Sequence, residues 1–194
     1  MTLTDHRHPD TRPPTQLPPA PGRTLSPKEL QAWVEEAARH PEWWEHLVAH
    51  DTGARHFASL YRDGDIDVWL LCWNVVDDTG WHDHDTSSGA VAVTRGVVTE
   101  ANPRMGGEPV VRTVSAGQSF AFGPDHIHRM GGAVDGSVSI HAYSPPLWRM
   151  GQYSISPSGV MRRMSISYAD ELRPLDGPDA LDSPDSLAAP DPVA

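Results

Sequence analysis

The sequence predicts an all-β fold, a closed antiparallel barrel or jelly roll preceded by short helices. From Phe57 onward, short runs of β-branched and aromatic residues alternate with turns rich in Gly, Asp and Asn. One-sided helical spacing, in contrast, is found only before residue 51. Some ten evenly spaced strands after a short helical segment are typical of barrels that hold a small ligand inside.

A single domain is expected within the 194 residues, over about 24–173. Residues 1–23 contain a Pro-rich run and almost no apolar side chains, and residues 174–194 repeat Pro, Asp, Ala and Ser without an aromatic residue. Neither segment can bury a core. We therefore expect a disordered N-terminus and a disordered acidic tail.

The formal net charge of −11 argues against a nucleic acid or an anionic membrane as partner, since both need a basic face. Part of this charge lies in the tail, so we expect the folded part to be only mildly acidic. The tail aspartates are Asp176, Asp179, Asp182, Asp185 and Asp191.

Cys72 is the one cysteine of the sequence, which excludes an intramolecular disulfide. The first residues lack the apolar run of a secretory signal, and no stretch approaches the about 20 apolar residues that span a bilayer. We therefore expect a soluble, cytoplasmic protein with no membrane partner.

The N-terminal helix is predicted to start at Ser26, a cap residue followed by Pro27 and, three residues on, by Glu29. Apolar residues then recur on one face until Pro41, which ends the helix. These residues are Leu30, Trp33, Val34 and Ala37. A second short helix is expected over 42–50, with its two tryptophans packed on the segment that follows.

The barrel strands are predicted from alternating apolar and polar residues between turn signals. They are 57–61, 66–75, 81–85, 89–94, 96–101, 109–114, 119–122, 126–130, 136–143, 150–154 and 159–165. Turns are expected at 62–65, 95–96 and 103–107.

His82 and His84 indicate a metal site. Side chains two residues apart on a strand share a face, so both imidazoles can reach one cation while Asp83 points away. His126 and His128 lie about forty residues on, and alternation allows either to be the third ligand. Three histidines form a transition-metal set. The alternative is a pair of partly buried histidines satisfied by neighbours, or a polar strand edge.

The spacing of glycines and histidines resembles the two motifs of the cupin barrel. The matching residues are Gly80, His82, His84, Gly89 and Gly96, and then Gly117, Pro124 and His128. Cupins typically place a glutamate ligand four or five residues after the second histidine, where this sequence has Ser88 and Gly89. The resemblance thus implies three neutral ligands, which leave a divalent metal its full charge and favour an anionic substrate such as a thiolate.

A more specific resemblance is to the cysteine dioxygenase family, over about residues 55–155. It rests on three stretches in order, with the Cys72-Trp73 pair before them. The stretches are His82-Asp83-His84, His128-Arg129 and Ser139-Ile140-His141-Ala142-Tyr143-Ser144-Pro145-Pro146. The resemblance implies Fe(II) bound by His82, His84 and His128, with His128 favoured over His126 because Arg129 follows it.

Ser139, His141 and Tyr143 alternate on one predicted strand and so share a face. The resemblance implies an outer-sphere triad, in which Ser139 orients His141, His141 hydrogen-bonds Tyr143, and the phenol faces the metal. The alternative is a polar stripe on an outer strand. Gly89 stands where the animal enzymes carry a cysteine that cross-links to the tyrosine, so no thioether can form there. Cys72 is expected to be a buried strand thiol.

Arg62, with Tyr61 beside it, resembles the arginine that binds the substrate carboxylate in this family, although a plain turn arginine is the alternative. The resemblance implies a monomeric dioxygenase that oxidises L-cysteine to its sulfinate with O₂. Other small thiols, such as 3-mercaptopropionate or ergothioneine, stay open as substrates. So do a non-catalytic metal-binding cupin and zinc hydrolase or hydratase chemistry on the same histidines.

Overall fold

The computed structural model describes residues 22–50, 55–156 and 160–167. The predicted disorder at the two ends, and most of the predicted domain limits, lie outside these residues and stay predictions. Among the described helices, none has the length and apolar character that crossing a lipid bilayer requires.

Helix α1 (Pro27–Ala38) begins as the sequence predicts, with a complete capping box between Ser26 and Glu29. The Ser26 hydroxyl accepts from the Glu29 backbone N–H, and the Glu29 carboxylate accepts from the Ser26 N–H at 2.9 Å. The predicted apolar face is the buried one: Leu30, Trp33, Val34 and Ala37.

The second helix predicted over 42–50 is wrong. The structure has two single 3-10 turns there, η1 (Pro41–Trp43) and η2 (Glu45–Leu47). The two tryptophans are held by different neighbours, which breaks a continuous helix. Trp44 is buried and donates its indole N–H to the Ala37 carbonyl at 3.2 Å, whereas Trp43 stacks on His40 at 4.2 Å between ring centroids.

The strands follow the predicted ones to within a few residues, which confirms the all-β fold class. In chain order they are β1 (Phe57–Arg62), β2 (Asp67–Trp73), β3 (Trp81–Asp83), β4 (Ser88–Arg95), β5 (Val97–Asn102), β6 (Val110–Ser115), β7 (Ser119–Phe122), β8 (Arg129–Gly132), β9 (Ser137–Ser144), β10 (Arg149–Ile155) and β11 (Met161–Ser167).

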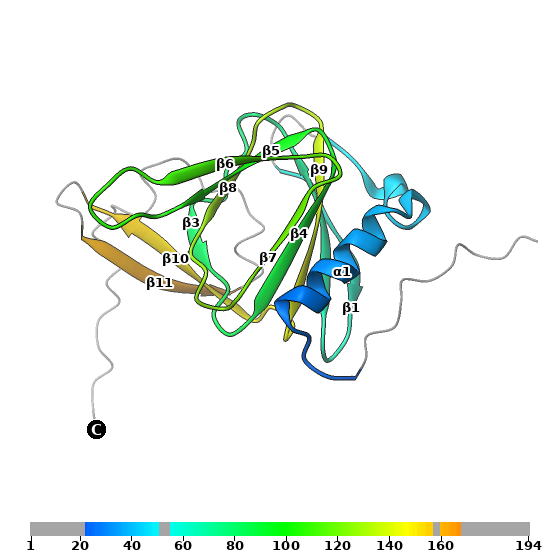
Figure 1. Ribbon diagram of the computed structural model, residues 1–194, viewed down its shortest axis with the longest axis horizontal. Helices are drawn as coiled ribbons and strands as arrows, with labels where there is room; N and C mark the ends of the chain where they lie inside the picture. The colour runs from blue at the N-terminus through cyan, green and yellow to red at the C-terminus, as the bar shows by residue number, and fades with distance from the viewer. Residues whose placement is uncertain (1–21, 51–54, 157–159, 168–194) are drawn as a thin grey trace, which may run out of the picture.

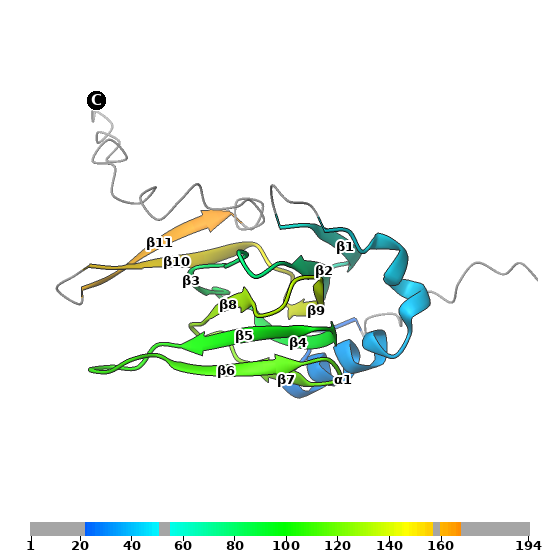
Figure 2. The same ribbon diagram turned by 90° about the horizontal axis from the view of Figure 1, so that it is seen from above.

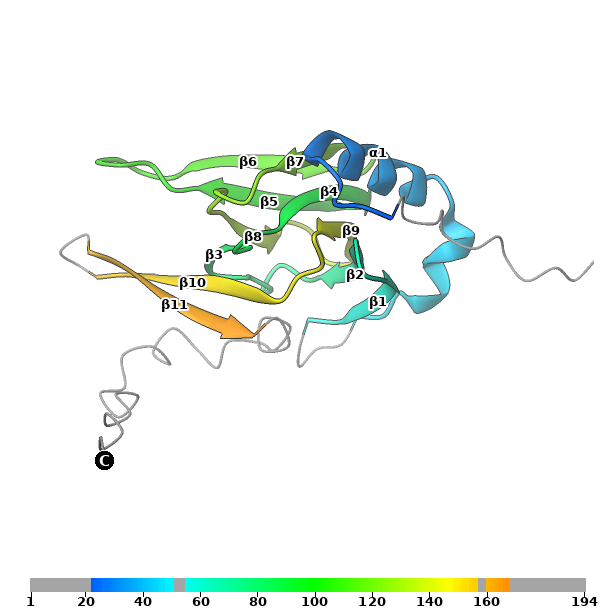
Figure 3. The same cartoon turned by 90° about the horizontal axis from the view of Figure 1, so that it is seen from below.

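All strand pairs are antiparallel and form three sheets, with orders β1-β2-β9-β4-β7, β11-β10-β3 and β6-β5-β8. An isolated bridge between His82 and His128 joins β3 to the residue just before β8, and a second, between Asp78 and Gly131, joins the segment before β3 to β8. The sheets surround a common interior (Figure 1). Seen from above and below, α1 covers one side, and the β5–β6 and β10–β11 hairpins extend away from it (Figures 2 and 3).

Alternation along β2 and β9 separates two buried layers. Val68, Leu70 and Cys72 of β2, like Ile140 and Ala142 of β9, pack in the cluster that includes α1. The residues between them, such as Trp73 and Tyr143, belong to a second cluster inside the barrel. Cys72 is only 1% exposed, which confirms the predicted buried thiol. The same alternation directs Ser139, His141 and Tyr143 into the barrel.

Candidate metal centre

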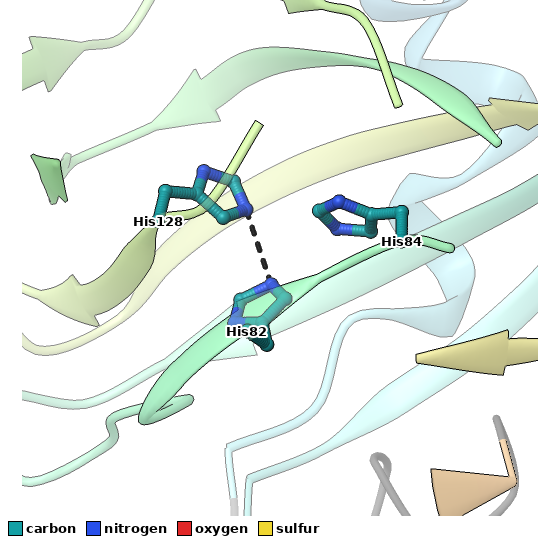
Figure 4. Close-up of side chains that lie close together, drawn as sticks. All are labelled: His82, His84 and His128. Atoms are coloured by element: carbon teal, nitrogen blue, oxygen red, sulfur yellow. Dashed lines mark hydrogen bonds between the residues drawn. The ribbon is translucent and has the colours of Figure 1, made fainter. Parts of the chain in front are cut away.

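A backbone bridge brings two of the predicted ligands together. His82 in β3 and His128 just before β8 exchange N–H···O bonds of 2.9 and 3.0 Å. Their Nε2 atoms lie 3.1 Å apart, and the His84 ring follows at the end of β3 with its centroid 4.9 Å from that of His82 (Figure 4). All three side chains are buried.

His84 shows that these residues fit a metal ion. Among the described residues, neither of its buried ring nitrogens has a hydrogen-bond partner, an arrangement that is costly unless the nitrogen has another partner. Burial, with the nearby His82 and His128, holds the pKa of His84 well below its usual range, so the ring is neutral with a lone pair. One ligand atom from each of His82, His84 and His128 lies within 4.8 Å of the others, a suitable set for a divalent transition metal.

The Nδ1 atoms of His82 and His128, which point away from the other histidines of this set, are hydrogen-bonded, and these bonds set the orientation of the two rings. His82 Nδ1 lies 3.1 Å from the Gly80 carbonyl oxygen, and His128 Nδ1 lies 3.0 Å from Glu100 Oε1. Both acceptors require an N–H on Nδ1, so Nε2 is the nitrogen that keeps a lone pair.

His126, the other candidate ligand, contacts the same Glu100 oxygen as His128, and the two ring centroids are 4.8 Å apart. Its Nε2 is 2.9 Å from Glu100 Oε1, and its ring stacks on Phe122 with centroids 4.8 Å apart. Glu100, His126 and His128 form a second group of metal-ligating types. The structure therefore gathers His82, His84 and His128, and puts His126 beside a carboxylate.

Asp83 points away from the histidines, as alternation predicts. Its carboxylate accepts from Tyr153 at 2.6 Å, from Arg163 Nε at 2.7 Å and from the Gly151 N–H at 3.0 Å. Burial alone would raise the pKa of Asp83, but the hydrogen bonds from Arg163 and Tyr153 outweigh it and hold the pKa well below its usual range. This ion pair fixes β3 against β10 and β11.

Ser139, His141 and Tyr143 form a hydrogen-bonded chain inside the barrel. Ser139 Oγ is 2.8 Å from His141 Nε2, and His141 Nδ1 is 3.3 Å from the Tyr143 hydroxyl. Trp73 Nε1 donates to Ser139 Oγ at 2.8 Å, and the Tyr143 ring stacks on His84 with centroids 5.1 Å apart. Because β9 lies between β2 and β4 and is buried, the alternative of a polar stripe on an outer strand is wrong.

Gly89 pairs with Tyr143 of β9 on one side and with Phe122 of β7 on the other. A Cβ at Gly89 would lie 2.3 Å from Phe122 Cζ, so the phenyl ring fills the space that a side chain would need. That ring packs beside His84, with centroids 4.8 Å apart. Gly89 carries no thiol to bond Tyr143, and Phe122 occupies this wall of the site.

A cavity adjoins the histidines and contains an arginine that the sequence analysis did not single out. Its lining residues are Arg55, Trp69, Leu71, Thr79, His82, His128, Met130, His141, Tyr143, Leu147 and Met150. The Arg55 guanidinium carbon lies 4.9 Å from the centroid of the Trp73 ring. Arg55 precedes β1 and belongs to no periodic pattern, so only the fold brings it to the site.

Arg62, the predicted substrate-binding arginine, does not line this cavity. Its Nη1 lies 2.5 Å from Asp67 Oδ2, and its Nη2 donates to the Leu147 carbonyl at 3.4 Å. The Tyr61 hydroxyl donates to Asp63 at 2.8 Å. Both side chains are engaged at the β1–β2 hairpin, and neither is among the described residues that line the cavity; their substrate-binding role stays a prediction.

The family model of cysteine dioxygenase type I matches residues 24–156. No curated protein sequence matches the chain. Among solved structures, a double-stranded β-helix protein from Klebsiella pneumoniae is 14% identical, with 52% of this chain and 80% of that chain covered and a TM-score of 0.46. KdgF from Halomonas sp. is 16% identical, with 53% and 91% covered and a TM-score of 0.43.

A third similar structure is an RmlC-like cupin protein from Desulfovibrio desulfuricans, 13% identical, with 51% of this chain and 90% of that chain covered and a TM-score of 0.44. Similarity at this level concerns the architecture alone. The family match, in contrast, spans both histidine stretches and the Ser139–Tyr143 strand.

Proposed function

Because the chain belongs to the cysteine dioxygenase type I family, we propose that it is a non-haem Fe(II) thiol dioxygenase that oxidises L-cysteine to cysteine sulfinate with O₂. One observation carries the proposal: three buried imidazoles converge beside a cavity that also contains Arg55 and Tyr143. Ferrous iron, when bound by His82, His84 and His128, supplies the redox chemistry and the open coordination positions that O₂ and a thiolate need.

Charge favours an anionic substrate at this site. The ligand set is neutral, so a divalent cation keeps its charge there and attracts a thiolate. Arg55 provides a second positive group in the same cavity, and a guanidinium pairs with a carboxylate through two parallel hydrogen bonds. A small thiol with a carboxylate, such as L-cysteine, matches both charges.

Tyr143 is the side chain best placed to act on the reacting sulfur and oxygen atoms. Its ring stacks on His84, and its hydroxyl lies 3.3 Å from Nδ1 of His141. Burial lowers the pKa of His141 well below its usual range, so His141 is neutral and can hold the phenol by a hydrogen bond without adding charge. In this proposal the phenol is a hydrogen-bond donor to the substrates, and Ser139 and Trp73 position His141.

A thiol without an amino group is the second candidate. The described residues that line the cavity include no carboxylate side chain, so the ammonium group of L-cysteine would find no ionic partner among them. 3-Mercaptopropionate has the thiol and the carboxylate but no amine. It therefore fits the lining as well as L-cysteine does.

The test is O₂ uptake and sulfinate formation by anaerobically purified, Fe(II)-loaded protein with L-cysteine, 3-mercaptopropionate and cysteamine. Arg55→Ala should lower kcat/KM for L-cysteine and 3-mercaptopropionate roughly 30-fold, which corresponds to about 2 kcal/mol of transition-state free energy. The reason is that the substrate carboxylate loses a charged hydrogen-bond partner in a buried site. Cysteamine lacks the carboxylate and should change little.

Arg62→Ala is the matched control. It removes an arginine at the β1–β2 hairpin, so it should lower the melting temperature without changing the ratio of L-cysteine to cysteamine turnover. If Arg62→Ala changes that ratio and Arg55→Ala does not, the substrate contact is misassigned. Iron-loaded protein that consumes O₂ with none of the thiols would favour a metal-binding cupin or a zinc enzyme.

A further inference from the structure

Glu100 is a fully buried carboxylate in β5, beside one of the three convergent histidines. Its Oε1 lies 3.0 Å from His128 Nδ1 and 2.9 Å from His126 Nε2. Its Oε2 accepts from Arg112 of β6 at 2.5 Å, and Glu100 and Arg112 are direct partners in the strand register. One carboxylate therefore connects a candidate metal ligand to a second imidazole and to a guanidinium.

The direction of these hydrogen bonds follows from the charge of Glu100. Arg112, whose guanidinium is always charged, donates to Oε2 of Glu100 at 2.5 Å, so the buried carboxylate is one half of an ion pair. An ionised carboxylate only accepts, so His128 must donate its Nδ1–H. The Nε2 lone pair of His128 then faces His82 and His84, where a metal ion would bind.

We propose that Glu100 supplies the carboxylate of the metal centre indirectly. In a two-histidine, one-carboxylate site the carboxylate binds the metal itself, whereas Glu100 binds the ligand His128. It is a positioning residue that delivers negative charge to the metal through His128, and Arg112 limits how much of that charge is delivered. An imidazole that donates to an anion is a more basic ligand. This inference rests on the proposed metal site and concerns its affinity and reduction potential.

Direct ligation by Glu100 is the competing interpretation, since Glu100, His126 and His128 also lie within ligand distance of one another. Three contacts argue against it. Two imidazoles already occupy Oε1, and Arg112 occupies Oε2. A cation there would face the guanidinium of Arg112, whereas the His84 side of His128 offers neutral nitrogens.

Changing Arg112 should affect the metal in the opposite sense to changing Glu100. The Arg112 side chain is 51% exposed, with the guanidinium carbon 4.5 Å from the centroid of the Phe120 ring, so it can be changed with little loss of core packing. By pairing with Glu100 it draws charge away from His128. Removing the guanidinium should therefore strengthen donation to the metal, the opposite of removing the carboxylate.

The experiment measures metal affinity and the Fe(III)/Fe(II) midpoint potential in the full chain, with Fe(II) added anaerobically and Co(II) as a second probe. Glu100→Gln keeps the shape and one acceptor but removes the charge. It should weaken metal binding about 10- to 100-fold and raise the potential. Arg112→Met should lower the potential relative to the parent protein.

Asp67→Asn is the matched control, because Asp67 is another fully buried carboxylate paired with an arginine, Arg62, but it contacts no candidate ligand. It should lower the melting temperature and leave the potential unchanged. A purely structural role of Glu100 would give the same pattern in Glu100→Gln and would overturn the inference.

The outcomes separate the two proposals. If the parent protein binds neither Fe(II) nor Co(II), the metal site itself is wrong. If the parent binds both ions while Glu100→Gln and Arg112→Met leave affinity and potential unchanged, only the role of Glu100 is wrong. Two ions per chain, one of them lost in Glu100→Gln, would make Glu100 a ligand and would also overturn the inference. If Glu100→Gln fails to fold, Arg112→Met still tests the role of Glu100: a lower midpoint potential supports it, and an unchanged or higher potential overturns it.

Discussion

At His84 a neutral, fully buried imidazole has no hydrogen-bond partner for either nitrogen among the described residues. Replacing His82, His84 or His128 by Ala should therefore remove most of the bound iron, since each change deletes one of three ligands. His126→Ala should retain iron because the His126 ring contacts Glu100 and Phe122 instead.

Metal analysis of anaerobically purified variants checks this assignment. His126→Ala is the control, since it removes an imidazole two residues from His128 and leaves all three proposed ligands in place. Loss of iron in His126→Ala together with retention in His128→Ala would reverse the assignment.

Tyr143→Phe should retain the metal and slow sulfur oxidation by roughly 10- to 1,000-fold, the range of one lost catalytic hydrogen bond or acid–base contact. The ring stacked on His84 remains, so only the hydroxyl near His141 is lost. Single-turnover kinetics with iron-loaded protein give the rate. Turnover equal to that of the parent would show that the Ser139–His141–Tyr143 chain is structural.

The sequence predicts which side chains share a face wherever they alternate on a strand, but not which residues tertiary packing brings to the site. Alternation alone separated His82 and His84 from Asp83 and put Ser139, His141 and Tyr143 on one face. It could not find Arg55, which precedes β1 and reaches the cavity through tertiary packing. Glu100 was not found either, because β5 comes next to His126 and His128 only through the β5–β8 pairing.

At the scale of elements, the close packing of β4 on β7 is set by Gly89. Gly89→Ala should destabilise the protein by about 1–3 kcal/mol, because the new Cβ would lie within 2.4 Å of two Phe122 ring atoms and that ring is held between His84 and His126. Urea unfolding gives the free energy, and iron affinity should also fall as Phe122 moves against His84.

Gly123→Ala is the control for this substitution, since no atom lies within 4 Å of a Cβ there and its φ is not positive. It should cause no loss of stability. If Gly89→Ala is as stable as Gly123→Ala and binds iron equally well, the close contact with Phe122 does not shape the site.

Strand positions were predictable because each strand is bounded by turn residues; the 95–96 turn, for example, uses Gly96 at a positive φ of 69°. The end of the helical segment was not predictable, because it depends on contacts that periodicity does not reveal. Trp43 stacks on His40, and Trp44 donates a hydrogen bond to the Ala37 carbonyl. The bridge between His82 and His128 likewise depends on strand pairing over 46 residues of chain separation.

For the molecule as a whole, burying neutral histidines makes stability depend on pH. Burial lowers the pKa of His84, His128 and His141 in the folded state below the ordinary value of 6.5. Below about pH 6.5 the unfolded chain therefore binds protons that the folded protein does not, so the metal-free protein should lose stability as the pH falls.

Urea unfolding of metal-free protein between about pH 5 and about pH 8 measures this dependence. His141→Gln should flatten the curve, because it removes one of the buried imidazoles outside the metal site. A free energy of unfolding that is constant or rises on acidification would contradict the neutral state of these rings.

Iron-dependent dioxygenation of a thiol at the three-histidine site is the activity that we propose. Its most direct measurement is single turnover of Fe(II)-loaded protein with L-cysteine or 3-mercaptopropionate and isotopically labelled O₂, followed by mass analysis of the product. We expect a sulfinate carrying both labelled oxygen atoms, with one O₂ consumed per thiol and no product from His84→Ala. A product that carries oxygen from water, or O₂ uptake by His84→Ala equal to that of the parent, would contradict it.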